Sequence, residues 1–206
     1  MNLQSVSARP AQSDELHLRL LAAGFKLSAP TLARTLYRRR SPARTSRDRD
    51  LAKMAASRPW MRVIFLGRQN AARSQMAEAF LRKHAADRFE VHSAGLVAGR
   101  IHELTYRVMK EAGIDISNQR AKRAREFLGR FAFDYAISVC NSAVEDCPRI
   151  FPSSLEFLSW PFDDPAIGSP AETESLTRFR ASRNAIEARI LAWLQQVPWQ
   201  PRDRTG

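Results

Sequence analysis

From residue 62 onward, short apolar runs alternate with longer stretches of helical periodicity. The run Arg62-Val-Ile-Phe-Leu66 is β-branched and aromatic, which predicts a buried strand, and further strands are predicted at 89–92, 133–139 and 155–160. Helices are predicted at 74–86, 104–112, 121–128 and 172–196. Strands that alternate with helices favour a parallel sheet, because parallel neighbours need long crossover connections. We therefore expect an α/β, three-layer fold with a four-stranded parallel sheet and helices on both faces.

The loop after the first predicted strand is the candidate binding site, because ligands bind at the carboxyl ends of the strands in such sheets. A tight strand-to-helix loop directs several backbone N–H groups to one point, beside the positive end of the helix dipole. Arg73 adds a planar guanidinium that can bind an oxyanion through two hydrogen bonds. Asn70 tolerates the left-handed backbone that such a loop often contains. The predicted oxyanion-binding residues are Gly67, Arg68, Gln69, Asn70, Ala71, Ala72, Arg73 and Ser74.

Composition limits the class of protein. The 44% of hydrophobic residues suffices for a core, and no apolar run approaches the length of a membrane span. The first residues, 1–15, are polar and lack the apolar stretch of a secretion signal. Two cysteines without such a leader indicate a reducing compartment. We expect a cytoplasmic protein with no membrane contact, no metal site and no cofactor.

Positive charge is concentrated at the start of the chain. Residues 1–60 hold 12 Lys and Arg against 4 Asp and Glu, whereas residues 61–206 hold 21 against 17. Predicted helices at 14–23 and 28–38 resemble a helix-turn-helix unit that would place Arg34 and Arg38 near phosphates. Two alternatives are a partly disordered basic arm and natural translation from Met61.

The predicted organisation has three parts. Residues 1–60 form a basic, partly helical or disordered extension, in which 38–50 is interpreted as a linker because it is charged and poor in apolar residues. Residues 61–197 form the α/β domain, and residues 198–206 form a tail. The extension makes nucleic acid a candidate partner, although charge alone carries no specificity.

Residues 66–80 resemble the signature of low-molecular-weight tyrosine phosphatases and thioredoxin-linked arsenate reductases. That signature is a cysteine, five residues, Arg and Ser, followed by a helix of the Gln-Met-Ala-Glu type. Further matches are Ser93-Ala94-Gly95, residues 108–117, Phe133-Asp134 and Asp164-Pro165. The resemblance extends from Arg62 to about Leu194 and implies the fold of that family.

The arsenate reductase branch is the more similar one. Cys140 and Cys147 follow the third predicted strand, where that branch has its two resolving cysteines, and residues 160–166 resemble its general-acid loop. The resemblance implies that the loop cysteine attacks arsenate and that Asp164 protonates the leaving oxygen. The cysteine pair would then pass its oxidation to thioredoxin or a similar thiol donor.

The sequence departs from the family at the nucleophile, because Gly67 stands where the attacking cysteine belongs. Covalent catalysis there needs a thiolate that the loop dipoles make acidic. Loss of a covalent nucleophile can lower turnover on the order of a millionfold. Ser74 is a weak substitute, since in the family it steadies the thiolate. We expect an oxyanion-binding protein with little phosphatase or reductase turnover.

Other interpretations stay open. Cys140 and Cys147 are either two small buried residues or a thiol pair, and pairing needs an irregular segment, since a straight helix would separate them by roughly 10 Å. Asp164 also fits a plain turn. Two further functional hypotheses are a thiol–disulfide enzyme that uses only the two cysteines and an anion-sensing, nucleic-acid-associated protein. A single base change at codon 67 would also explain the glycine.

Overall fold

The computed structural model describes residues 46–56, 59–141, 146–148, 150–168 and 171–197. Contacts divide the chain into two units, residues 1–44 and 45–206, and all the described residues belong to the second unit. The predicted helices at 14–23 and 28–38, and the tail at 198–206, lie outside the described residues.

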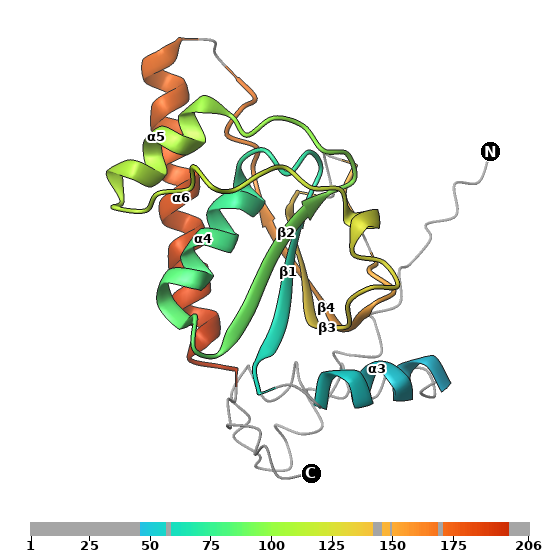
Figure 1. Cartoon of the computed structure of the whole chain (residues 1–206). Coiled ribbons are helices and arrows are strands. Elements are labelled where there is room, and N and C mark those ends of the chain that lie inside the picture. Colours follow the sequence, from blue (N-terminus) through green and yellow to red (C-terminus); the bar gives the residue numbers. More distant parts are fainter. Residues whose placement is uncertain (1–45, 57–58, 142–145, 149, 169–170, 198–206) are drawn as a thin grey trace, which may run out of the picture. The chain divides into compact units, whose positions relative to one another are not determined.

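Four parallel strands form the sheet, in the order β2-β1-β3-β4 (Figure 1). The predicted α/β fold with a four-stranded parallel sheet is confirmed. β1 and β2 end in register, with Gly67 opposite Gly95, so the two strands finish at the same level. Each strand extends one to three residues beyond its predicted bounds at one or both ends: β1 is Met61–Gly67, β2 Phe89–Gly95, β3 Phe133–Cys140 and β4 Ser154–Phe162.

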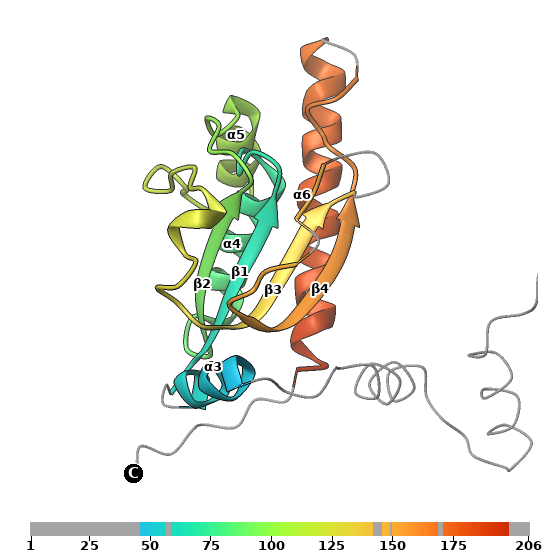
Figure 2. The same cartoon turned by 90° about the vertical axis from the view of Figure 1, so that its right-hand side faces the viewer.

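Three helices cover one face of this sheet, namely α4 (Arg73–Ala85), α5 (Glu103–Glu111) and α6 (Glu172–Leu194). Figure 2 shows them together behind the strands. Phe65 of β1 and Phe80 of α4 are fully buried in the main core, and so is Phe179 of α6. The buried residues of α6 recur at helical spacing, so this helix buries one face. Residues 73–81 of α4 are all buried, so the first part of α4 is covered on every side.

The second face carries a 3-10 turn, η1 (Ala124–Glu126), and its flanking segments. Ile64 and Leu66 of β1 pack there with Phe127 and Phe151. The predicted helix at 121–128 is therefore wrong in length and type. The reason is that the backbone of Lys122 bonds to the loop after β1 and to β2, which removes it from any helical ladder.

A helix that the sequence analysis missed, α3 (Ser46–Ala56), precedes β1 and contacts β3 and β4. The linker interpretation is wrong for residues 46–50. The helix begins within the charged run because the apolar residues Leu51 and Ala52, which follow that run directly, are half-buried.

A polar cluster surrounds Glu90 on β2. Trp60 Nε1 and Arg62 Nη2 donate to Glu90 Oε2 at 2.9 and 2.7 Å, and His92 Nε2 lies 2.8 Å from Glu90 Oε1. Burial alone would raise the pKa of Glu90, but these hydrogen bonds lower it to about 2. Burial also lowers the pKa of His92, which packs against phenylalanine rings.

Candidate oxyanion-binding site

The candidate site is the anion loop, residues 67–74, at the carboxyl end of β1. Gly67 is the last residue of β1, and Arg73 and Ser74 are the first residues of α4. The connection from β2 to α5 runs beside this loop (Figure 1). Four carbonyl oxygens of the loop accept hydrogen bonds of 2.9–3.2 Å from backbone N–H groups of that connection: Gly67 from Leu96, Arg68 from Val97, Gln69 from Gly99, and Ala71 from His102.

The N–H groups of the loop have no such partners. Within the part of the chain that the structure describes, the backbone N–H groups of residues 68–72 donate to no protein acceptor. No side chain caps the start of α4 at Ala72. Unpaired N–H groups beside a helix N-terminus are donors suited to an anion.

Asn70 fixes the shape of the loop. Its φ of 54° lies in the left-handed region, as expected from the sequence, and its side chain is buried. Nδ2 donates to Ser74 Oγ at 3.0 Å and to Ser93 Oγ at 2.8 Å. Oδ1 accepts from Gln75 Nε2 at 2.9 Å and from the Lys122 N–H at 2.8 Å. The loop is therefore tied to α4, β2 and the segment before η1.

A buried polar network below the loop was not predicted. Glu78 is 2% exposed, and its carboxylate accepts a short hydrogen bond from Ser93 Oγ. Lys122 Nζ lies 3.3 Å from Glu78 Oε2, and Arg82 Nη2 lies 2.5 Å from Glu78 Oε1. These partners satisfy a carboxylate that burial would otherwise penalise. The available signal was that polar residues 75 and 78 stand among the apolar residues of the inner face of α4.

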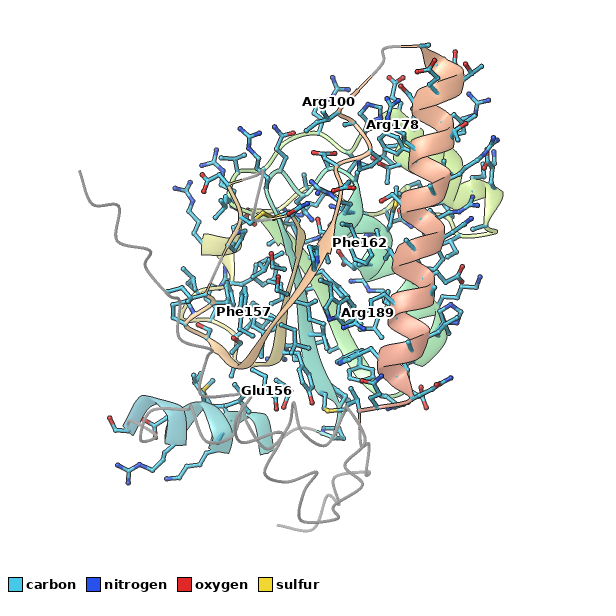
Figure 3. The ribbon with its side chains drawn as sticks, turned by 180° about the vertical axis from the view of Figure 1, so that it is seen from behind. Arg100, Glu156, Phe157, Phe162, Arg178 and Arg189 are labelled. Atoms are coloured by element: carbon cyan, nitrogen blue, oxygen red, sulfur yellow. A yellow bond between two sulfur atoms is a disulfide. The ribbon has the colours of Figure 1, made fainter. Side chains whose placement is uncertain are left out.

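Arg73 is buried at 7% exposure and points toward the end of β4. Its Nη1 donates to the Phe162 carbonyl at 2.7 Å, and its Nη2 lies 3.1 Å from Asp164 Oδ2. Phe162 pairs with Cys140 across the β3–β4 ladder and is labelled in Figure 3. The structure thus brings Arg73, Asp164 and Cys140 to one end of the sheet. Asp164 Oδ1 also accepts from the Ala166 N–H at 3.0 Å, so it forms the plain turn as well.

Gly67 and Gly95 differ in what an added methyl group would meet. The φ of Gly67 is not positive, and a Cβ there would lie 3.2 Å from Ser74 Oγ, so a side chain requires only a small shift of that hydroxyl. A Cβ on Gly95 would lie 2.5 Å from the Val97 carbonyl oxygen and 2.8 Å from Arg68 O. Position 67 therefore has room for a Cβ atom once Ser74 Oγ shifts slightly, whereas a Cβ at position 95 would clash with the backbone of the anion loop and of Val97.

Cys140 and Cys147 form a disulfide with a Cα–Cα distance of 6.1 Å. Cys140 ends β3 and is fully buried, and Cys147 lies in an irregular segment, as pairing requires. The Asn141 amide donates to Asp163 Oδ1 at 3.1 Å, which joins the loops after β3 and β4. The described residues contain no group of three or more His, Cys, Asp or Glu that could hold a metal ion. No described helix has the length and apolar composition of a membrane span.

The family model described as low molecular weight phosphotyrosine protein phosphatase matches residues 62–202. The chain belongs to this family. Among its relatives are arsenate reductases of Halalkalibacterium halodurans, 38% identical over 128 residues, and of Bacillus subtilis, 34% identical over 128 residues. Each alignment covers 62% of this chain and 91% of the relative. The glutaredoxin arsenate reductase of a Synechocystis strain is 33% identical over 129 residues, which is 63% of this chain and 92% of that protein.

Solved structures agree with this assignment to the phosphatase family. An arsenate reductase in the phosphate-binding state superposes with a TM-score of 0.55 at 30% identity, covering 67% of this chain and 99% of that one. An arsenate reductase in the oxidized state gives a TM-score of 0.55 at 31% identity, covering 66% and 97%. The family resemblance seen in the sequence is therefore confirmed.

Proposed function

We propose that this member of the phosphatase family binds a phosphate- or arsenate-type oxyanion in the anion loop but has little or no turnover. One observation carries the proposal: the loop carbonyls are tied to the β2–α5 connection while the N–H groups of residues 68–72 have no described acceptor, next to the buried Arg73. Backbone N–H groups, a helix N-terminus and a guanidinium together suit a tetrahedral anion.

The carboxylate of Asp164 lowers the affinity of the site for an anion. Its carboxylate already contacts Nη2 of Arg73, while Nη1 is held by the Phe162 carbonyl. Arginine has five N–H donors, so an anion can bind the same guanidinium, but it does so beside a like charge. Anion affinity is therefore weaker than the donor set alone would give.

The missing thiolate accounts for the proposed loss of turnover. In the family reaction a thiolate sulfur forms a bond to arsenic or phosphorus, an oxygen leaves, and a carboxylic acid supplies its proton. Asp164 stands where that acid is expected, but Gly67 has no atom that can form the first bond. Ser74 is the nearest hydroxyl to the place of the lost side chain, and no described general base contacts it.

Turnover assays test this account. Arsenate reductase activity, with a thioredoxin-type donor, and aryl phosphatase activity should be measured for the natural protein, Gly67→Cys and Gly67→Ala. We expect background rates for the natural protein and for Gly67→Ala, and an increase of about a thousandfold or more for Gly67→Cys. Robust turnover by the natural protein would refute the proposed loss of turnover.

Phosphate binding tests the anion loop separately from turnover. A ligand at one hundred times its Kd stabilises the folded state by about 2.7 kcal/mol. We expect phosphate to raise the melting temperature of the natural protein and to leave that of Arg73→Ala unchanged. Equal stabilisation of the two proteins would place the anion elsewhere.

A second candidate function rests on the disulfide between Cys140 and Cys147. A donor dithiol would attack one sulfur, and two electrons and two protons would convert the pair to thiols while the donor became a disulfide. Cys147, at 7% exposure, is the more accessible partner. Thiol–disulfide exchange in the natural protein that disappears in Cys140→Ser would support this function, and unchanged exchange would exclude it.

Several expectations from the sequence remain proposals. The oxyanion-binding domain comprises residues 61–197, between the basic extension at 1–60 and the tail at 198–206. A thioredoxin-type donor and a cytoplasmic location follow from the family resemblance and the cysteine content. Nucleic-acid binding through residues 1–60 would be supported by salt-sensitive DNA binding that a 1–60 deletion abolishes.

A further inference from the structure

The positive charge of residues 61–206 is concentrated in one segment. Residues 118–131 hold five Lys and Arg against the single carboxylate of Glu126, whereas the rest of 61–206 holds sixteen of each sign. A solvated surface normally mixes the two signs. The basic residues of this segment are Arg120, Lys122, Arg123, Arg125 and Arg130.

The backbone of this segment is attached to the anion loop, where the Lys122 N–H donates to Asn70 Oδ1 at 2.8 Å, and also to α4 and β2. Gln75 Nε2 donates to the Arg120 carbonyl at 3.1 Å, and the Lys122 carbonyl accepts from the Gly95 N–H at 2.9 Å. Arg123 forms a parallel bridge with Gly95, which in turn pairs with Gly67. Since neighbouring strands lie about 4.8 Å apart, the Arg123 backbone lies roughly 10 Å from the start of the anion loop.

The arginine side chains of this segment remain in solvent. Arg120 is 72% exposed and its contact with Glu126, at 3.6 Å, is a weak surface pair. Arg123 and Arg125 are exposed, and no carboxylate among the described residues forms an ion pair with either guanidinium, although the backbone N–H of Arg123 donates to Glu126 Oε1 at 2.7 Å. Lys122 differs, because Glu78 already neutralises it.

Two further exposed arginines belong to the anion loop and to the β2–α5 connection beside it. Arg68 belongs to the anion loop itself, and Arg100 follows Gly99, whose N–H donates to the Gln69 carbonyl. Figure 3 labels Arg100 near the carboxyl ends of the strands. We call this set the basic rim: Arg68, Arg100, Arg120, Arg123 and Arg125.

We propose that the basic rim binds the additional phosphates of an oligophosphate ligand whose terminal phosphate occupies the anion loop. The proposal rests on the proposed function. A single oxyanion needs only the loop and Arg73. The exposed arginines of the basic rim, of which only Arg120 has a carboxylate partner among the described residues, repel one another in the free protein. A chain of phosphates relieves that repulsion and reaches from the loop to the rim, where arginine forks bind phosphate oxygens.

Calorimetric titration of the full chain tests the rim. Inorganic phosphate, tripolyphosphate and ATP should be titrated into the natural protein and Arg123→Gln/Arg125→Gln. The control is Lys83→Gln/Lys110→Gln, which removes the same charge from the exposed sides of α4 and α5. We expect tripolyphosphate to bind about tenfold more tightly than phosphate, as two exposed charge contacts allow. In Arg123→Gln/Arg125→Gln, the preference for tripolyphosphate over phosphate should fall below about threefold, while the affinity for phosphate stays unchanged. The control variant should keep the preference of the natural protein.

The outcomes separate the two proposals. Phosphate binding without any preference for tripolyphosphate, or a preference that the rim variant and the control lose equally, would overturn the rim and leave the anion loop standing. Absence of phosphate binding to the natural protein would overturn the proposed function. Tighter binding of both ATP and tripolyphosphate than of phosphate supports an oligophosphate ligand. If ATP binds more tightly than tripolyphosphate, the ligand is a nucleotide; if tripolyphosphate binds more tightly, the ligand is a free phosphate chain.

Discussion

Among glycine-to-alanine substitutions at the described glycines, Gly95→Ala should destabilise the anion loop most. The new Cβ would lie 2.5 Å from the Val97 carbonyl oxygen, 2.8 Å from the Arg68 carbonyl oxygen and 2.8 Å from the Asn70 nitrogen. All three are backbone atoms, so no flexible side chain can move aside. Relief requires that the loop separate from the end of β2.

The expected magnitude follows from these contacts. Forced overpacking typically costs about 1–3 kcal/mol, and three backbone clashes place Gly95→Ala near the upper end, about 3 kcal/mol. For a domain of this size each kcal/mol lowers the melting temperature by about 2–4 °C, so we expect a decrease of about 6–12 °C. Gly67→Ala is the matched control. Its Cβ would meet only Ser74. Alanine also lowers the conformational entropy of the unfolded chain, which stabilises the folded state by about 0.4–1 kcal/mol. The free energy of unfolding of Gly67→Ala should therefore stay within about 1 kcal/mol of the natural value.

Urea unfolding and phosphate titration of the two variants provide the assay. Gly95→Ala should be less stable and should bind phosphate at least tenfold more weakly, whereas Gly67→Ala should retain both properties. A Gly95→Ala protein with natural stability and natural phosphate affinity would refute the reasoning, because it would mean that the loop does not close onto β2.

Three further substitutions have defined outcomes. Asp164→Asn removes the negative charge beside Arg73, so calorimetry should show phosphate binding about fivefold tighter, a gain of about 1 kcal/mol, and unchanged affinity would contradict the contact. Glu78→Gln removes the carboxylate that Lys122 and Arg82 contact and should cost about 2 kcal/mol in urea unfolding, whereas exposed Glu174→Gln should cost far less. Glu90 has a pKa lowered from 4.5 to about 2, so it binds fewer protons folded than unfolded, and stability falls as pH falls through that window. Glu90→Gln should reduce this loss, and an identical acid titration of stability in the variant would exclude the contribution.

Local patterns predicted most of the fold. The β-branched run at 62–66 and the apolar positions of 172–196 lie in β1 and α6, where both periodicity and burial point to the same structure. The prediction failed at 121–128, since helix propensity there is overridden by backbone hydrogen bonds to Asn70 and Gly95. Such bonds join residues far apart in the chain and leave no periodic signal.

The site was partly readable from the sequence. The spacing from Gly67 to Arg73 predicted a strand-to-helix loop, and Asn70 indicated its left-handed residue. The Glu78 network was not predicted, because a carboxylate within a helix is usually a surface residue. Nor did the sequence show that Arg73 contacts the Phe162 carbonyl, since backbone acceptors are the same in every residue.

A crystal structure of the protein grown with phosphate or arsenate tests the central claim most directly. We predict a tetrahedral anion whose oxygens accept hydrogen bonds of about 2.7–3.2 Å from the N–H groups of residues 68–73 and from the Arg73 guanidinium. An anion bound elsewhere, or loop N–H groups directed away from one another, would contradict it.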